Sequence, residues 1–340
     1  MRVATCRTRI TGRPSRPPGR AAWRPSKRSV GWRARRDSHL AILDRLLAAC
    51  IGFVPRGVVG KVAAKYVAGE TIEDAVAAAR RLREAGCCTT FDLLGEFITE
   101  ESQADATADE YIELLDRIEQ DGFDGNISVK LTAFGLQLDE EHAYERLKRV
   151  VAHARSLGNF VRIDMEDSSC TDATFRLYRR LRADGFDNAG LVLQAYMRRT
   201  LDDISALTEL TPSYRICKGI YVEAEEVAFQ EAEEIRDGFR AALAAMLDNG
   251  SYVGIATHDE ILIAAGREAV ASRSLDHDRY EFQMLLGVTD HLRKQVVADG
   301  HRVRVYVPYG RDWYAYCVRR LKENPRIGRY VFLAMFRRGS

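Results

Sequence analysis

Residues 126–165 read NISVKLTAFGLQLDEEHAYERLKRVVAHARSLGNFVRIDM, and this stretch decides the fold. It begins with a short run of apolar and β-branched residues, Asn126–Leu131, and ends with a second such run, Phe160–Met165. Between them, apolar residues of Glu140–Ser156 recur at i, i+3 and i+4, the spacing of an amphipathic helix. The stretch therefore predicts a strand, a helix and a second strand, which is the unit of a parallel sheet.

The same unit recurs from about residue 86 to the C-terminus. Eight short apolar runs start 23 to 38 residues apart, the length of a βα unit rather than of a hairpin: Cys88–Leu94, Asn126–Leu131, Phe160–Met165, Gly190–Ala195, Tyr214–Gly219, Tyr252–Thr257, Tyr280–Leu285 and Val303–Pro308. Helical patterns separate them, as in Asp109–Gln120, Glu140–Ser156, Ala173–Arg182, Ala224–Leu247 and Thr289–Asp299. Eight such units in ~250 residues predict an α/β protein with a (β/α)8 barrel. A doubly wound open sheet is the alternative, but the glycine-rich dinucleotide motif typical of that fold is absent.

The chain divides into three parts by composition. We expect a basic disordered leader at 1–37, a helical N-terminal cap at 38–85 and the barrel at 86–340. Residues 1–36 contain 12 of the 51 basic residues and none of the 49 acidic ones, so they carry +12 and the remainder −10. Four of the eight prolines also lie there, which predicts disorder. An organelle transit peptide, a start codon placed too far upstream and a tether to an anionic surface all explain this composition.

The composition of the chain excludes several classes of protein. With 46% hydrophobic and 29% charged residues in 340, it is typical of a soluble globular enzyme. The longest apolar run, Leu46–Val54, is about half of the ~20 residues that a membrane-spanning helix requires. The seven cysteines form no C-x-x-C pair, so neither a disulfide framework nor a thiolate metal site is expected. A reducing compartment such as the cytoplasm fits best.

Polar residues lie where almost every predicted strand ends. In a (β/α)8 barrel the site is built from these ends, and ionisable groups buried together without a ligand would be costly. The candidates are Lys130, Asp164, Glu166, Asp167, Gln194, Tyr196, Arg215, Lys218, Thr257, His258, Asp259, Tyr306 and Tyr309. Taken singly, each is more often a solvated or ion-paired residue than a catalytic one. Together at one face they predict a functional site.

The last predicted helix, residues 313–323, carries the sharpest local motif. It follows Asp312, a plausible N-cap, and places Tyr316, Arg319 and Arg320 on one face, with Glu323 able to pair with Arg319. An arginine pair beside an aromatic ring suits a carboxylate, because a planar guanidinium binds it through two parallel hydrogen bonds. Without the barrel, an ordinary amphipathic helix with a solvated basic face would be the simpler interpretation.

Eight motifs resemble those of the proline dehydrogenase family, in the family's order and spacing, over residues ~70 to 337. They are SVKLTAFG (128–135), VRIDMED (161–167), LVLQAYMRR (191–199), YRICKGIY (214–221), GIATHD (254–259), YEFQMLLG (280–287), VYVPYG (305–310) and WYAYCVRRLKEN (313–324). The resemblance implies a distorted (β/α)8 barrel with FAD bound at the strand ends and a C-terminal helix over the site. It implies hydride transfer from C5 of L-proline to FAD, giving Δ1-pyrroline-5-carboxylate, and a quinone as electron acceptor.

The resemblance also assigns residues to these roles. Lys130, Arg319 and Arg320 would hold the proline carboxylate. Leu285, Tyr306 and Tyr316 would line the pocket, with Asp164 orienting its neighbours through Tyr306. The FAD-contacting set would be Gln194, Arg215, Cys217, Lys218, Gly219, Thr257, His258 and Glu323, the last acting through Arg319. Two departures from the family stand out: Cys217 replaces an aliphatic residue, and Ile220 and Val222 flank Tyr221 where members vary.

Other functions stay in competition at this level. Lys130 and Lys218 would suit a Schiff-base aldolase, and the Arg-rich leader would suit a nucleic acid or another anionic surface. We predict no metal site, because neither Asp276-His277-Asp278 nor His258-Asp259 offers three converging ligands. We also predict no nucleic-acid partner as the main function, because the body of the chain is acidic and the leader has no aromatic-interleaved fold. A quinone acceptor implies peripheral contact with the inner face of a membrane, while the leader leaves organelle targeting open. The choice of imino acid, the acceptor and the oligomeric state are not determined by the sequence.

Overall fold

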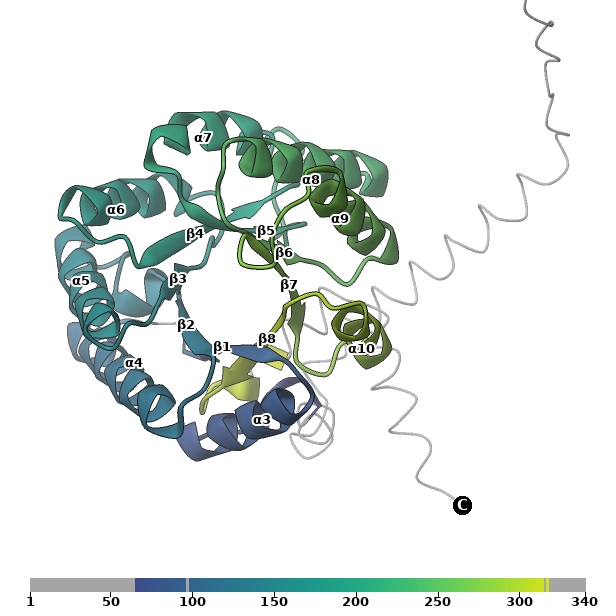
Figure 1. Cartoon of the computed structure of the whole chain (residues 1–340). Coiled ribbons are helices and arrows are strands. Elements are labelled where there is room, and N and C mark those ends of the chain that lie inside the picture. Colours follow the sequence, from purple (N-terminus) through teal and green to yellow (C-terminus); the bar gives the residue numbers. More distant parts are fainter. Residues whose placement is uncertain (1–64, 96–97, 315, 318–340) are drawn as a thin grey trace, which may run out of the picture.

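The computed structural model describes residues 65–95, 98–314 and 316–317, and in them eight parallel strands close into a barrel (Figure 1). Each strand pairs with the next along the chain, and β1 pairs with β8. The strands are β1 (Cys88–Leu93), β2 (Gly125–Val129), β3 (Val161–Ile163), β4 (Ala189–Gln194), β5 (Ser213–Cys217), β6 (Val253–Ala256), β7 (Tyr280–Leu285) and β8 (Val303–Tyr309). All eight predicted strands are present, so the prediction of a (β/α)8 barrel is confirmed.

A helix follows each of the first seven strands and covers the outside of the barrel (Figure 1). These helices are α4 (Glu101–Asp121), α5 (Glu140–Ser156), α6 (Thr171–Ala183), α7 (Thr200–Leu207), α8 (Ala232–Asp248), α9 (Glu260–Ser272) and α10 (Asp290–Ala298). The pattern predicted over Ala224–Leu247 extends too far toward its N-terminus, because residues 224–231 form a turn and an isolated β-bridge, and α8 begins only at Ala232.

Helix α3 (Ile72–Glu84) precedes the barrel strands and packs against β8 and β1 (Figure 1). It lies within 38–85, the range predicted to be a helical cap, but residues 67–69 of that range are not helical and 38–64 lie outside the described residues. Thr71 begins the helix with a capping box: its hydroxyl accepts from Asp74 N at 3.2 Å, while Asp74 Oδ2 accepts from Thr71 N at 3.1 Å. This pairing satisfies two backbone donors at the helix start.

The strands alternate between an apolar outer face and a polar inner face. Outward-facing residues such as Ile127, Val129, Val161 and Ile163 are fully buried against the helices and form the hydrophobic core. Inward-facing side chains include Asp92, Ser128, Arg162, Asp164, Arg215, Glu281, Gln283, Arg304 and Tyr306. The bores of (β/α)8 barrels are usually filled by branched apolar residues, so a polar bore indicates function.

Two glycines make room for this polar bore. A Cβ at Gly190 would lie 2.6 Å from Arg162 Nη1, and a Cβ at Gly254 would lie 2.5 Å from Gln283 Nε2. At both positions the bare backbone therefore accommodates a large polar side chain of a neighbouring strand.

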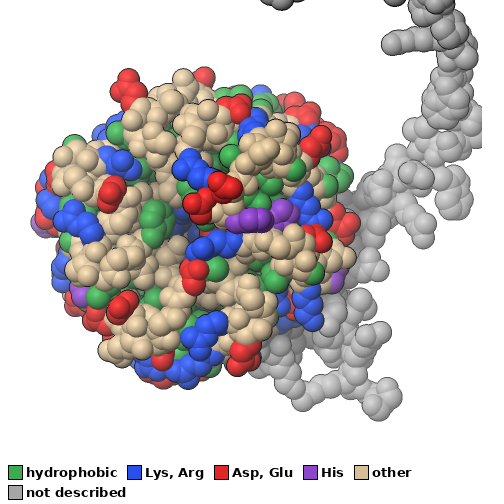
Figure 2. Space-filling model, viewed as in Figure 1, with side chains coloured by type: hydrophobic (Ala, Val, Ile, Leu, Met, Phe, Trp, Pro, Cys, Tyr) green, Lys and Arg blue, Asp and Glu red, His purple; other side chains and the backbone are tan. Residues whose placement is uncertain are grey.

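On the outside, acidic and basic side chains are interspersed over the end of the barrel that faces the viewer in Figure 2, and histidines lie near its centre.

Candidate functional site

Asp164, directly after β3, is the hub of the polar cluster at the strand ends. Its Oδ1 accepts from Ser128 Oγ at 2.6 Å and from Arg215 Nη1 at 2.7 Å. Its Oδ2 accepts from Tyr306 Oη at 2.8 Å. Four strands, β2, β3, β5 and β8, thus meet at one carboxyl group, as expected where strands of a barrel converge.

The charges around Asp164 keep it ionised. Burial by itself would raise its pKa, but the positive charges of Arg215 and Lys130 and hydrogen bonds from Ser128 and Tyr306 lower the pKa below the ordinary value of 3.8. Burial, and then the charge of Asp164, raise the pKa of Tyr306 well above its ordinary value. Tyr306 is therefore a neutral donor and Asp164 an anionic acceptor.

Lys130 lies beside this hub, just after β2. Its Nζ donates to Asp92 Oδ1 at 2.6 Å and to Tyr306 Oη at 3.4 Å, and lies 3.8 Å from Asp164 Oδ2. The lysine side chain is 9% exposed. A buried ammonium requires a nearby anion, and Asp92 at the end of β1 provides it.

The β4 and β5 ends are joined by Gln194 and by a close glycine contact. Gln194 Nε2 donates to the carbonyl of Glu166 at 2.8 Å, and its Oε1 accepts from the backbone N of Ile220 at 3.3 Å. Gly219 has a φ of +115°, and a Cβ there would lie 2.1 Å from the Tyr196 ring. Only glycine permits this backbone to lie so close to the ring.

The β6 end carries Thr257, His258 and Asp259. Asp259 caps α9 and accepts from Lys218 Nζ at 3.3 Å and Arg236 Nε at 2.9 Å. His258 Nε2 accepts from the backbone N of Leu285 at 2.9 Å. Burial, with a smaller effect of the Lys218 charge, lowers the pKa of His258 to about 4, so the ring is neutral at pH 7 and carries its proton on Nδ1.

The remaining predicted residues lie at the same strand ends or beyond the described part. Cys217 ends β5, with Sγ 3.7 Å from the carbonyl of Leu193, and half-buried Leu285 ends β7. Tyr316 is buried in a small apolar cluster with Val67, Leu94 and Cys317. Arg319, Arg320 and Glu323, the core of the predicted carboxylate clamp, lie outside the described residues.

Sequence analysis missed Asp92, Ser128 and Gln283, which contact the predicted residues directly. Asp92 pairs with Lys130, Ser128 bonds Asp164, and Gln283 accepts from Arg215 Nε at 2.5 Å. All three occupy inward-facing positions of their strands. The two-residue period of a strand predicts their inward orientation, because each lies between two outward-facing apolar residues.

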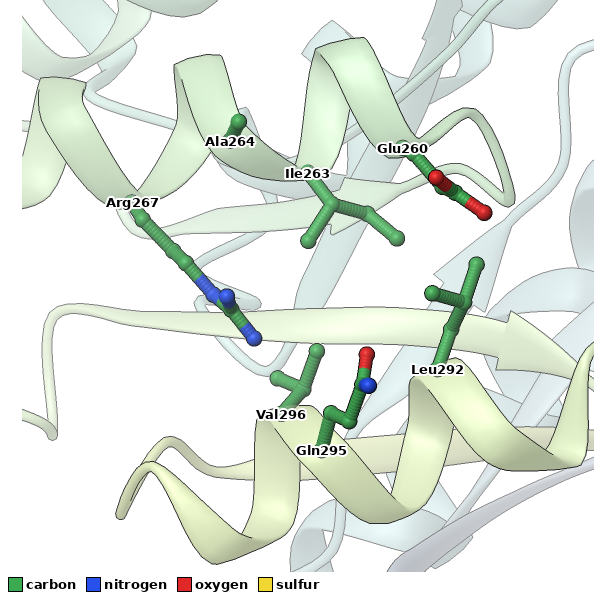
Figure 3. A pocket seen from close by; sticks show the side chains of 7 residues that line it. All are labelled: Glu260, Ile263, Ala264, Arg267, Leu292, Gln295 and Val296. Carbon is green, nitrogen blue, oxygen red and sulfur yellow. The ribbon is translucent and has the colours of Figure 1, made fainter.

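A separate hollow lies outside the barrel between α9 and α10 (Figure 3). Its volume is about 190 Å³. Glu260 and Arg267 lie at its two ends, with Gln295 and apolar side chains between them (Figure 3). The lining residues are Glu260, Ile263, Ala264, Arg267, Leu292, Gln295 and Val296. None of the predicted site residues lines it, so the hollow is distinct from the strand-end cluster.

A closed parallel barrel with a buried, ion-paired cluster at its strand ends defines the class of (β/α)8-barrel enzymes. The profile of the family described as proline dehydrogenase matches residues 75–329. A proline dehydrogenase of Deinococcus radiodurans is 38% identical over 279 residues, covering 81% of this chain and 90% of that protein. Proline dehydrogenase 1 of Bacillus subtilis is 36% identical over 276 residues, covering 81% and 91%.

A solved structure supports the same relationship. Proline utilization A (PutA) from Bdellovibrio bacteriovorus, inactivated by N-propargylglycine, superposes with a TM-score of 0.73 at 25% identity, covering 82% of this chain and 34% of that much longer one. The chain belongs to the proline dehydrogenase family. It is accordingly an oxidoreductase acting on the CH–NH group of donors, and its activity is the oxidation of proline, the first step of proline catabolism. Among the described residues, no helix has the length and apolar character needed to span a membrane.

Proposed function

We propose that this chain oxidises L-proline to Δ1-pyrroline-5-carboxylate with FAD bound at the carboxyl ends of its strands. The observation that carries the proposal is the buried cluster of Lys130, Asp164, Arg215 and Tyr306, joined by the hydrogen bonds given above. When bound, FAD would supply the redox chemistry, as acceptor of the hydride that C5 of proline loses and as donor of the electrons to a quinone.

The residues on β4, β5 and β6 fit FAD by the chemistry of their donors. Lys218 has 44% of its side chain exposed and provides a cation suited to a pyrophosphate. Arg215, with 7% of its side chain exposed, provides a cation suited to the flavin ring. Neutral donors and acceptors complete the proposed set, which comprises Gln194, Cys217, Gly219, Thr257 and His258. Glu323 would act from the last helix by orienting Arg319.

The opposite side of the cluster suits the substrate. Lys130 is held in place by Asp92 and Tyr306, so its ammonium needs little further ordering to bind the proline carboxylate. Arg319 and Arg320 would complete the carboxylate clamp. Leu285 and Tyr316, with Tyr306, would form the walls around the pyrrolidine ring. Placing the donor carbon against the flavin is the main contribution such a pocket makes to catalysis.

Asp164 acts in this proposal by orienting its neighbours rather than by taking a proton. Its two oxygens accept three hydrogen bonds, from Ser128, Arg215 and Tyr306, and its pKa is lowered. A carboxylate so engaged is a weak base. His258 Nε2 is likewise engaged by the backbone N of Leu285. Proline would therefore enter with its nitrogen already deprotonated by solvent.

The proposed quinone acceptor determines the setting of the enzyme. Quinones reside in membranes, so the proposal includes peripheral contact with the inner face of a membrane from the cytoplasm. Lipid vesicles containing a quinone should retain the protein on flotation, and vesicles lacking the quinone provide the control.

An anaerobic visible spectrum of the purified protein tests the reaction. We expect a flavin band near ~450 nm that disappears on addition of L-proline and returns with a soluble quinone. Lys130→Met should preserve the band and weaken the response to proline, because Lys130 belongs to the proposed substrate contacts and not to the proposed FAD contacts. Since Asp92 and Tyr306 also lose a bond, circular dichroism checks that the variant is folded. A flavin band indifferent to proline would contradict the proposed substrate, and a protein that takes up no FAD would contradict the proposed cofactor.

A further inference from the structure

The polar cluster at the strand ends continues down the bore of the barrel. Arg215 Nε donates to Gln283 Oε1 at 2.5 Å, and Gln283 Nε2 donates to Glu281 Oε1 at 2.6 Å. Glu281 Oε1 also accepts from Arg304 Nε at 2.8 Å. Each of these four residues is at most 6% exposed. Three strands, β5, β7 and β8, thus contribute to one buried chain of hydrogen bonds.

The partners of Gln283 leave only one orientation for its amide. An arginine only donates hydrogen bonds and an ionised carboxylate only accepts them. Burial would raise the pKa of Glu281, but the charge of Arg304 and its hydrogen bonds lower it, so this carboxyl group is ionised. The amide oxygen must therefore face Arg215 and the amide nitrogen must face Glu281. Gln283 is the neutral link between a cation and an anion.

The backbone of β6 holds this amide in place. Gly254 pairs with Glu281 in the sheet, and a Cβ at Gly254 would lie 2.5 Å from Gln283 Nε2 and 2.8 Å from its Cδ. The glycine lets the amide pack directly against the backbone, which leaves the side chain little room to rotate. This packing is independent of the hydrogen bonds and acts on the same group.

We propose that Gln283 is a positioning residue for Arg215. It holds the guanidinium so that Nη1 lies 2.7 Å from Asp164 Oδ1, and it accepts from Nε without neutralising the positive charge. A carboxylate at this position would cancel that charge, whereas an apolar side chain would leave Nε unpaired. The inference rests on the proposed function, because the charge matters to catalysis through the flavin that Arg215 would contact.

The test compares Gln283→Met with Thr90→Val in the holoenzyme. Thr90, 1% exposed, donates from Oγ1 to Asn126 Oδ1 in the same bore and does not touch Arg215, so Thr90→Val also removes a buried hydrogen bond. We expect Gln283→Met to slow flavin reduction by proline about 10- to 100-fold and to shift the midpoint potential of the flavin. Thr90→Val should change neither. Equal effects of both variants, or no effect of Gln283→Met, would overturn the proposal.

A double variant tests whether Gln283 acts through Arg215. In an Arg215→Met background, Gln283→Met should slow flavin reduction no further, since the group it positions is gone. A further loss equal to that in the wild type would contradict the inference. If Gln283→Met does not fold, Gln283→Asn keeps a neutral amide in the bore but is one methylene too short to hold Arg215 Nε and Glu281 together. It should also shift the midpoint potential, because Arg215 loses its positioning contact; an unchanged potential would overturn the proposal.

The potentials are measured by reductive titration without proline, which separates the two proposals. A flavoprotein that proline does not reduce contradicts the proposed function alone, and the potentials of Gln283→Met, Gln283→Asn and Thr90→Val still decide the role of Gln283. A wild-type protein without FAD contradicts both proposals.

Discussion

Arg215 and Asp164 are bonded across the inside of the barrel, with Nη1 of the arginine 2.7 Å from Oδ1 of the aspartate. Arg215 lies on β5 and Asp164 directly follows β3, and these two strands do not pair with each other, since β4 lies between them. Breaking one partner of a buried ion pair leaves an uncompensated charge. The pair therefore links the stability of the barrel to the geometry of the proposed FAD site.

Asp164→Asn should lower the free energy of unfolding at pH 7 by about 3 kcal/mol, since Arg215 loses its buried counter-charge. The pKa of Asp164 is lowered in the folded state, so its stabilising effect is present above the ordinary value of 3.8 and is lost as the pH falls through the folded value. The difference between wild type and variant should accordingly stay nearly constant from pH 7 to about 4 and shrink only below the ordinary value of 3.8. Urea unfolding at pH values above and below 3.8 measures this difference, and a difference that does not shrink below 3.8 would contradict the assignment.

Tyr306→Phe should lower the free energy of unfolding by about 1.5–3 kcal/mol, because its hydroxyl donates to an ionised carboxylate. Tyr214→Phe is the matched control: among the described residues, the buried Tyr214 hydroxyl has no hydrogen-bond partner. Its removal should change the stability by less than about 0.5 kcal/mol. Urea denaturation measures the free energy of unfolding of both variants. Equal losses would show that the bond to Asp164 contributes nothing specific.

The protein should lose stability between pH 6.5 and about 4 because of His258. Its pKa is lowered from 6.5 to about 4 in the folded state, so the unfolded chain binds the proton first as the pH falls. The stabilising effect is complete above pH 6.5 and is lost as the pH falls through the folded value. His258→Leu should therefore flatten the pH dependence of stability, by about 1–2 kcal/mol between pH 7 and pH 5. An NMR titration that gives His258 a midpoint near 6.5 would contradict this expectation.

Gly219→Ala should impair folding or cofactor uptake, because the new Cβ would lie 2.1 Å from Tyr196 at a φ of +115°. Gly250→Ala is the control: Gly250 also has a positive φ, +80°, but its Cβ would meet no atom within 4 Å. The control should cost about 1 kcal/mol from backbone strain alone, and the site variant distinctly more. Thermal unfolding and the FAD content of each purified variant provide the measurements, with similar results for both arguing against a tight glycine contact.

The order of elements could be predicted from the sequence because strands and helices have local signals. The runs Cys88–Leu94 and Tyr280–Leu285 match strands of the structure to within one residue. The long pattern over Ala224–Leu247 is less accurate, since residues 224–231 form a turn and an isolated β-bridge. They hydrogen-bond to the segment after β4, as Phe229 N does to the Tyr196 carbonyl at 2.8 Å. Such contacts join distant segments, and helical periodicity does not report them.

The polar residues of the site could be predicted individually, but their partners could not. Lys130 and Asp164 stood out because charged residues are rare at the ends of apolar strands. That Lys130 pairs with Asp92, 38 residues away, depends on the closure of the barrel. Gln283 was not predicted as a site residue, because it is uncharged and lies within a largely apolar run. Its importance follows from Arg215 on one side and Glu281 on the other.

The sequence by itself determined the eight βα units, the family and the identity of the charged strand ends, because periodicity and motif order are properties of the linear chain. The tertiary structure alone decided which charges face each other. Closing the sheet placed Asp164 among donors from β2, β5 and β8, and gave Gln283 a bare glycine backbone to pack against. Pair energies depend on distance and burial, and both arise only when strands distant in sequence meet inside the barrel.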